Sequence, residues 1–71
     1  MSISVRIKLG QKIRRLRIER KLTQDRLAEL TGIDYKYVQK IEGKTPPAIR
    51  IDTIQKIAKA LKVKLVDLMD I

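Results

Sequence analysis

Residues 23–42, TQDRLAELTGIDYKYVQKIE, predict two short helices separated by a tight turn. Thr23 carries a hydroxyl that can cap the first helix, and Asp34 can cap the second in the same way. Gly32 is the residue type that most readily ends a helix in the left-handed conformation. The second helix is therefore expected at about Tyr35–Ile41.

Both helices carry an apolar face at helical spacing. Leu27, Ala28 and Leu30 supply it in the first helix, and Val38 and Ile41 supply it in the second. Helices this short cannot lie side by side along a long seam, so they must cross steeply. Steep crossing after a short turn is the geometry of a helix-turn-helix.

The composition indicates one small domain that spans residues 1–71. Hydrophobic residues make up 44% of the chain, but its only aromatic residues are two tyrosines, so Ile, Leu, Val and Ala must build the core. Without cysteine, disulfides and thiolate chemistry are excluded. The sequence has neither an apolar run long enough to span a membrane nor a signal peptide, so we expect a cytoplasmic protein.

The net charge of +9 favours a polyanionic partner, nucleic acid before an anionic membrane. Residues 1–21 carry eight basic side chains and one acidic one, whereas residues 22–45 carry four of each. The excess positive charge therefore lies mainly on the first helix and not in the central stretch. A basic face that serves only solubility is the simpler explanation of this charge.

Three further helices are expected around this motif. The first runs from Ser2 or Ser4 to about Arg20, on the spacing of Val5, Leu9, Ile13 and Leu16. Gly10 lies inside this helix and weakens it. Close approach of another helix would explain the glycine, and a tolerated flaw is the equal alternative.

The chain after the motif predicts a loop and two helices. Gly43, Pro46 and Pro47 end the second motif helix and hold an extended loop. A helix over about 51–61 follows, with an apolar stripe, and a short helix over about 65–69 ends the pattern; the stripe comprises Ile51, Ile54, Ile57, Ala58 and Leu61. With no strand pattern, the fold class is all-α with five helices.

The quoted residues resemble the lambda-repressor-like (Cro-type) helix-turn-helix family. The matching pattern is IRRLRIERKLTQDRLAELTGIDYKYVQKIEGK, residues 13–44, followed by IDTIQKIAKALKV, residues 51–63. Within it, residues 32–42 are most similar to the controller regulators of restriction–modification systems, and phage repressors are a second possible group. The resemblance implies a compact five-helix, DNA-binding transcriptional regulator, such as a repressor.

Helical geometry then selects the residues that would read bases. Successive residues of a helix are about 100° apart, so Val38 and Ile41 gather on one side of the second motif helix. The opposite side, which would enter the major groove of double-stranded DNA, carries Tyr35, Lys36, Gln39 and Lys40. For each lysine the competing interpretation is an ordinary solvated charge.

Other side chains are expected to hold phosphates. Gln24, at the start of the first motif helix, is a candidate on its position and on the resemblance. Lys44 and Thr45 follow the second helix, and the hydroxyl of Tyr37 is a further candidate, although Tyr37 is expected mainly to pack. Weaker candidates for the same role are Lys21, Arg26 and Arg50.

The resemblance also implies a structural ion pair between Arg17 and Glu42. In the family, the matching positions form a partly buried salt bridge that fixes the second motif helix against the first helix of the domain. If both side chains were exposed, the pair would contribute little to stability.

One recognition helix reads only a few base pairs, so a homodimer on a palindromic operator is expected. Four apolar residues late in the chain are candidates for the dimer contact, although closing the monomer core is the alternative for each: Leu65, Leu68, Met69 and Ile71.

The sequence offers little for catalysis. With no histidine and no cysteine, the commonest general base and the commonest thiol nucleophile are missing. We expect no enzyme activity, no cofactor, no metal and no membrane partner. Two rival functions remain: an antitoxin that clamps a toxin protein, and a module that binds structured RNA or an acidic protein.

Overall fold

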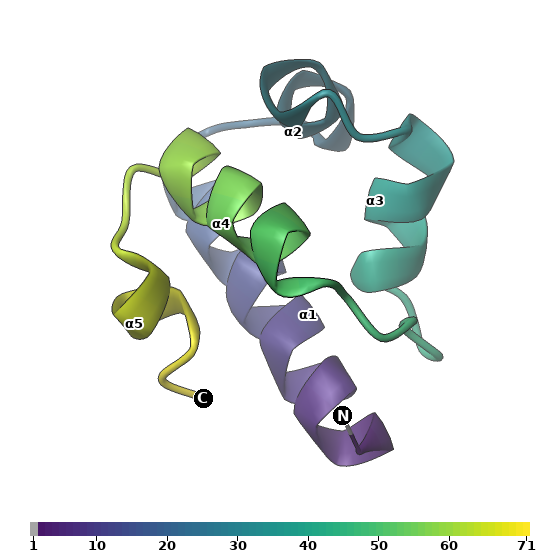
Figure 1. Ribbon diagram of the computed structural model, residues 1–71. Helices are drawn as coiled ribbons and strands as arrows, with labels where there is room; N and C mark the ends of the chain where they lie inside the picture. Colours follow the sequence, from purple (N-terminus) through teal and green to yellow (C-terminus); the bar gives the residue numbers. More distant parts are fainter. Residues whose placement is uncertain (1) are drawn as a thin grey trace.

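The computed structural model describes residues 2–71, and every regular element within them is a helix. The five helices are α1 (Ile3–Glu19), α2 (Gln24–Thr31), α3 (Tyr35–Ile41), α4 (Ile51–Ala60) and α5 (Leu65–Leu68) (Figure 1). The expected all-α, five-helix fold is confirmed. The expected far ends of α1, α4 and α5 differ from the observed ones by a single residue.

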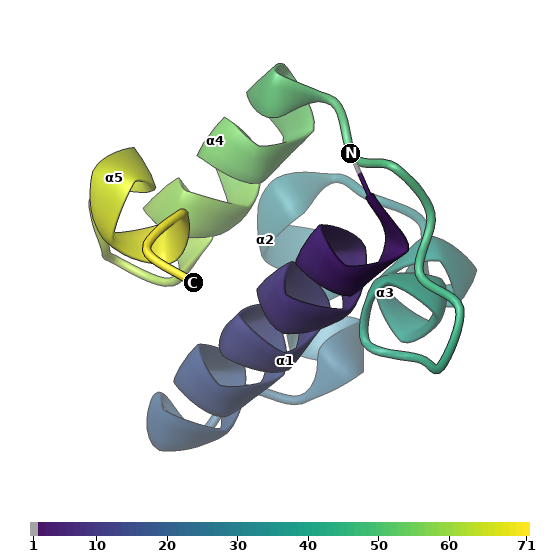
Figure 2. The ribbon, with the colours of Figure 1, turned by 90° about the horizontal axis from the view of Figure 1, so that it is seen from below.

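Helix α1 forms the spine of the molecule. Helices α3 and α5 lie on opposite sides of it in both views, and α4 covers it between them (Figures 1 and 2). Helices α2 and α3 cross steeply, as the short lengths of the motif helices require (Figure 1). The motif helix α3 is thus displayed at one side of the molecule and the last helix at the other.

Three helices begin as the sequence predicts, with a side-chain oxygen that accepts a backbone N–H. Ser2, and not Ser4, caps α1 by accepting from the N–H of Val5 at 3.3 Å. Thr23 caps α2, accepting from Arg26 at 3.0 Å, and Asp34 caps α3, accepting from Lys36 at 3.2 Å. Gly32 ends α2 with φ of 73°, in the left-handed conformation that was expected.

Two other helix ends use lysine where glycine is usual. Lys21 after α1 and Lys62 after α4 have φ of 56° and 58°. In each case the next residue donates its N–H back to the helix: Leu22 to the carbonyl of Arg17 and Val63 to that of Ala58, both at 3.0 Å. Leu22 and Val63 also pack against the core, so apolar contact holds the lysines in a conformation that only glycine adopts freely.

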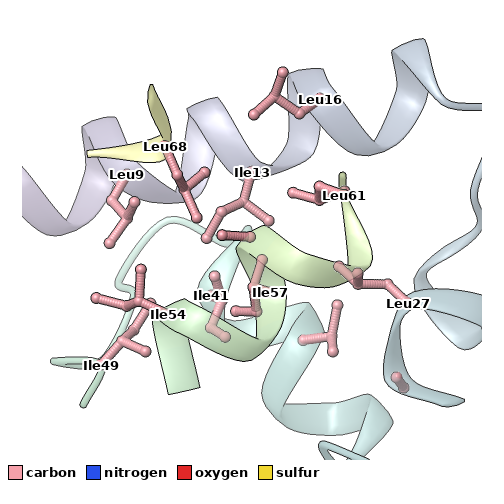
Figure 3. Packing of buried hydrophobic residues seen from close by; sticks show 13 residues of the cluster. Leu9, Ile13, Leu16, Leu27, Ile41, Ile49, Ile54, Ile57, Leu61 and Leu68 are labelled. Carbon is pink, nitrogen blue, oxygen red and sulfur yellow. The ribbon is translucent and has the colours of Figure 1, made fainter. Parts of the chain in front are cut away.

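The buried core draws on all five helices (Figure 3). Its aliphatic composition agrees with the sequence expectation, but three assignments were wrong. Ile51 is 60% exposed and Leu30 also lies at the surface, so neither belongs to the buried face of its helix. Leu68 is wholly buried in the monomer, which removes it from the predicted dimer contacts.

Gly10 lies where α1 meets the end of α3. A Cβ atom at this position would overlap the backbone carbonyl oxygen of Ile41. The expected close approach of another helix is therefore present, and it fixes how near α3 can come to α1.

Candidate nucleic-acid interface

The outer face of α3 presents a row of polar side chains to solvent. Tyr35, Lys36, Gln39 and Lys40 are all exposed, whereas Val38 and Ile41 on the inner face are each 1% exposed. The apolar side of α3 therefore packs against the core, and its polar side faces solvent. The structure brings the four predicted base-reading residues onto one surface.

The loop after α3 extends this surface. A shallow, open depression is lined by residues of the outer face and of the loop: Lys36, Gln39, Lys40, Gly43, Lys44 and Thr45. The predicted phosphate contacts Lys44 and Thr45 thus adjoin the predicted base readers. Because the lining includes three lysines and no carboxylate, it attracts anions.

The predicted ion pair between Arg17 and Glu42 is present behind this surface. Nε of Arg17 donates to Oε2 of Glu42 at 2.8 Å, and Nη2 donates to Oε1 at 2.9 Å. The Arg17 side chain is 12% exposed and that of Glu42 is 2% exposed. This two-point contact in a desolvated setting joins α1 to the residue that ends α3.

Gln24 belongs to the same network. Its Nε2 donates to Oε1 of Glu42 at 3.2 Å, while Nη1 of Arg17 donates to the carbonyl of Leu22 at 2.7 Å. The hydrogen bond to Glu42 raises the pKa of Arg17 above its ordinary value, against the opposing effect of burial. The network joins α1, the start of α2 and the end of α3, so the first motif helix is held by the same carboxylate as the second.

The predicted phosphate contact of Tyr37 is not supported. The ring is half-buried against the core, and the hydroxyl lies 3.4 Å from the carbonyl of Ala48, to which it donates. Its hydrogen is therefore directed at the loop before α4. The weaker candidates Lys21, Arg26 and Arg50 are exposed.

Tyr35 and Gln39 are linked by a hydrogen bond that the sequence interpretation missed. Nε2 of Gln39 donates to the hydroxyl of Tyr35 at 3.1 Å. The two residues stand four apart in a helix, the spacing at which side chains meet on one face. The spacing of four residues is visible in the sequence and could have indicated this contact.

The last helix leaves an apolar surface on the side of the molecule away from α3. Val66 is 70% exposed and Ile71 is 43% exposed, while Leu65 and Met69 are half-buried against the core. Val66 is the most exposed residue of this group, although the sequence interpretation did not include it. Nζ of Lys12 donates to the carbonyl of Asp70 at 3.1 Å and so ties the segment after α5 to α1.

Residues 2–71 contain neither a candidate metal cluster nor a helix that could span a membrane. No group of three His, Cys, Asp or Glu side chains there is arranged to hold a metal ion. In the same part of the chain, no helix combines the length and the hydropathy needed to cross a bilayer.

Residues 12–71 match the sequence model of the family described as the Cro/C1-type HTH DNA-binding domain. The chain belongs to this family. Control protein C.BamHI from Bacillus amyloliquefaciens is 35% identical over 71 residues, which cover 99% of this chain and 86% of that protein. The chain is accordingly a DNA-binding transcriptional regulator and not an enzyme.

Solved structures agree with this family. The restriction–modification controller protein C.AhdI from Aeromonas hydrophila superposes with a TM-score of 0.83 at 35% identity, covering 89% of this chain and 94% of that one. The biofilm master regulator SinR, solved in complex with DNA, gives a TM-score of 0.81 at 29% identity and covers 87% and 98%. Both similarities extend over nearly the whole five-helix domain.

Proposed function

We propose that this regulator binds a palindromic duplex sequence-specifically as a homodimer, with α3 of each copy in a major groove. The observation that carries the proposal is the polar row on α3, continuous with the lysine-bearing loop. A helix fits the major groove, and its outward side chains reach base edges there. The buried Arg17–Glu42 pair supports this function because it fixes the direction in which α3 points.

The side chains of the interface divide into two roles. Lys36 and Lys40 carry cations that donate to guanine O6 and N7, and Gln39 has the amide that pairs with adenine. Lys44 and Thr45 contact phosphates beside the groove, and Gln24 does so at the start of α2. Phosphate contacts fix the register of the protein on the duplex, while base contacts provide the sequence preference.

The dimer forms through the apolar surface of the last helix in this proposal, with Val66 and Ile71 at its centre and Leu65 and Met69 at its edge. Each copy measures about 27 × 25 × 21 Å. Because α3 and α5 lie on opposite sides of α1, pairing two copies through α5 sets the two α3 helices far apart. Half-sites one DNA turn apart, about 34 Å, require a separation of that order.

The relatives support a proposal about the regulated genes. C.AhdI is a restriction–modification controller protein, and 94% of its length is similar to this chain. We therefore propose that this chain controls the genes of a restriction–modification system, in the cytoplasm where those genes are transcribed.

A selection from random DNA duplexes with the purified protein tests this function. Enriched sequences should form a palindrome whose half-sites are about one turn apart. Failure to enrich any duplex, together with tight binding of structured RNA or of a toxin protein, would support the rival functions instead.

Single lysine variants separate the two contact types. Lys36→Ala should cost about 1–3 kcal/mol of binding free energy on the selected site and little on random DNA. Lys44→Ala should weaken both alike and reduce the salt dependence. Lys56→Ala, which removes an exposed lysine on α4, is the control for net charge. Equal losses from Lys36→Ala on both kinds of DNA would show that Lys36 does not read bases.

The association state has its own test. Val66→Asp and Ile71→Asp should each convert the dimer to a monomer in sedimentation experiments, because a charge in a closed apolar contact is costly to desolvate. Leu30→Asp places the same charge at an exposed leucine of α2 and should leave the dimer intact. A Val66→Asp protein that still sediments as a dimer would place the contact elsewhere.

A further inference from the structure

The hydrogen bond between Tyr35 and Gln39 distinguishes one base-reading candidate from the others. Gln39 is held by the Tyr35 hydroxyl at 3.1 Å, one helical turn towards the start of α3. Within residues 2–71, the side-chain ammonium groups of Lys36 and Lys40 make no hydrogen bond and no ion pair, and Lys36 bonds to Asp34 only through its backbone N–H. The outer face of α3 therefore combines one side chain that is fixed in advance with two that are not.

We propose that Tyr35 is a positioning residue that holds Gln39 ready to read an adenine in each half-site. The inference rests on the proposed function and deepens it, because it assigns one base and the residue that enforces the choice. In this role Tyr35 acts through Gln39, and its own hydroxyl makes no base contact.

The hydrogen-bonding capacity of the Gln39 amide and the Tyr35 hydroxyl allows this arrangement. A side-chain amide nitrogen carries two N–H groups, so Tyr35 can accept one while the other remains available. Adenine requires a donor for N7 and an acceptor for its N6 amino group, and the free N–H and the carbonyl oxygen of Gln39 supply both. The Tyr35 oxygen accepts one N–H of Gln39 with a lone pair, so both groups that adenine needs remain available on Gln39.

The same arrangement disfavours guanine. Guanine presents two acceptors, N7 and O6, in the major groove. An amide held with one N–H committed to Tyr35 has a single donor left, and its carbonyl oxygen then meets the guanine O6. Two facing acceptors leave both groups unsatisfied, which is the expensive outcome for buried polar atoms.

Fixing Gln39 in advance also makes binding more favourable. A free glutamine side chain loses rotamer freedom when it binds a base, and part of that loss is avoided when a neighbour already restricts it. Tyr35 itself has only two rotatable side-chain torsions, so it restricts Gln39 at small entropic cost.

Tyr35→Phe tests the proposal because it keeps the ring and removes only the acceptor. On the selected palindrome, its affinity should fall about 3- to 10-fold, with binding of random duplex unchanged. The preference for adenine over guanine at one position per half-site should fall by a similar factor. Gln39→Ala should abolish that preference, and Tyr35→Phe should add no further loss in the Gln39→Ala background. Tyr37→Phe removes the other tyrosine hydroxyl, which faces Ala48, and should leave the base preference intact.

A measurement on the free protein examines the contact without DNA. The side-chain amide resonances of Gln39 should shift in Tyr35→Phe and stay in place in Tyr37→Phe. Unshifted Gln39 resonances would show that the contact does not exist in solution and would overturn the proposal.

The binding outcomes separate this inference from the function on which it rests. Two outcomes would show that the Tyr35 hydroxyl contacts DNA directly. One is that Tyr35→Phe loses as much affinity for random duplex as for the selected one. The other is that the affinity losses of Tyr35→Phe and Gln39→Ala add in the double variant. If Gln39→Ala changes the base preference at no position of the palindrome, the adenine assignment is wrong, while the regulator function still stands. Failure to select any palindrome would remove both.

Discussion

The junction between α1 and α3 and the region of α4 and α5 are built in different ways. At the junction, Gly10 lets the two helices touch, and the Arg17–Glu42 pair joins them largely shielded from water. In the second region, the N-cap residues of α4 and α5, Arg50 and Lys64, make no side-chain cap hydrogen bond. That region also leaves large apolar residues in solvent, among them Ile51 and Val66.

The difference corresponds to the role that we propose for each region. A helix that reads bases must be held in one direction, and hydrogen-bonded charges and a glycine contact specify direction in a way that aliphatic packing does not. The later helices complete the core with aliphatic contacts, which tolerate small shifts. In the proposed dimer, their exposed apolar surface meets a second copy.

Glu42→Ala should produce the largest change in stability. Removing one partner of a buried pair leaves Arg17 uncompensated, which typically costs about 3–5 kcal/mol of the free energy of unfolding. Urea denaturation followed by circular dichroism measures it. Glu29→Ala is the matched control, because Glu29 is exposed and its ion pair with Arg26 contributes only about 0–1 kcal/mol.

Similar small losses of stability from Glu42→Ala and Glu29→Ala would contradict the role assigned to the junction. A double variant, Arg17→Met with Glu42→Leu, should recover much of the stability because no charge is then stranded. It should still bind the selected DNA poorly, since nothing polar directs the end of α3.

Gly10→Ala should come next in size. Alanine normally stabilises a helix interior relative to glycine by about 1 kcal/mol, but here the added methyl overlaps the Ile41 carbonyl. We expect a net loss of about 1–3 kcal/mol and a weaker affinity for DNA as α3 is displaced. The control is Gln11→Ala at the exposed neighbouring position, and a gain in stability from Gly10→Ala would show that the helices are not in firm contact.

Arg50→Ser should improve the start of α4. The backbone of Arg50 already has the extended conformation of an N-cap, with φ of −68° and ψ of 147°. A serine hydroxyl there can accept an N–H of the first turn and should add about 0.5–2 kcal/mol to stability. Thr23→Ala removes an existing cap from α2 and should change the melting temperature in the opposite direction. If Arg50→Ser melts no higher than the parent, the start of α4 does not limit stability.

Lys62→Gly should give the smallest effect, a gain of about 0.5–1 kcal/mol, because φ of 58° is unfavourable for lysine and free for glycine. Lys59→Gly, within α4, should instead lose about 1 kcal/mol. Chemical denaturation of the two variants in parallel makes the comparison. A loss from both would show that Lys62 is not strained.

The sequence predicted the elements well where the signal was local. Side-chain caps at Thr23 and Asp34 and the left-handed Gly32 act within a few residues, so each could be identified from neighbours in the chain. Lys21 and Lys62 escaped prediction because no glycine marks them. Their conformation depends on Leu22 and Val63 reaching the core, which is a contact over a distance.

The candidate site, like the helices, was predictable where the signal was local. Helical periodicity was sufficient to place Lys36, Gln39 and Lys40 on one face, and it also placed Tyr35 one turn from Gln39. It did not show that these two side chains bond, because i and i+4 neighbours meet only when their rotamers allow it. The direction of the Tyr37 hydroxyl towards Ala48 joins residues from separate elements, so spacing alone did not reveal it.

By itself, the sequence determined five helices, the starts of four of them and the polar face of α3, because periodicity and caps are properties of short segments. It also carried the family pattern that implied the Arg17–Glu42 pair. Only the tertiary structure decided which apolar residues are buried, removing Leu68 from the surface and leaving Val66, Ile51 and Leu30 on it. Burial depends on how helices pack around α1, and a 71-residue chain has too little core to enclose every apolar side chain of each stripe.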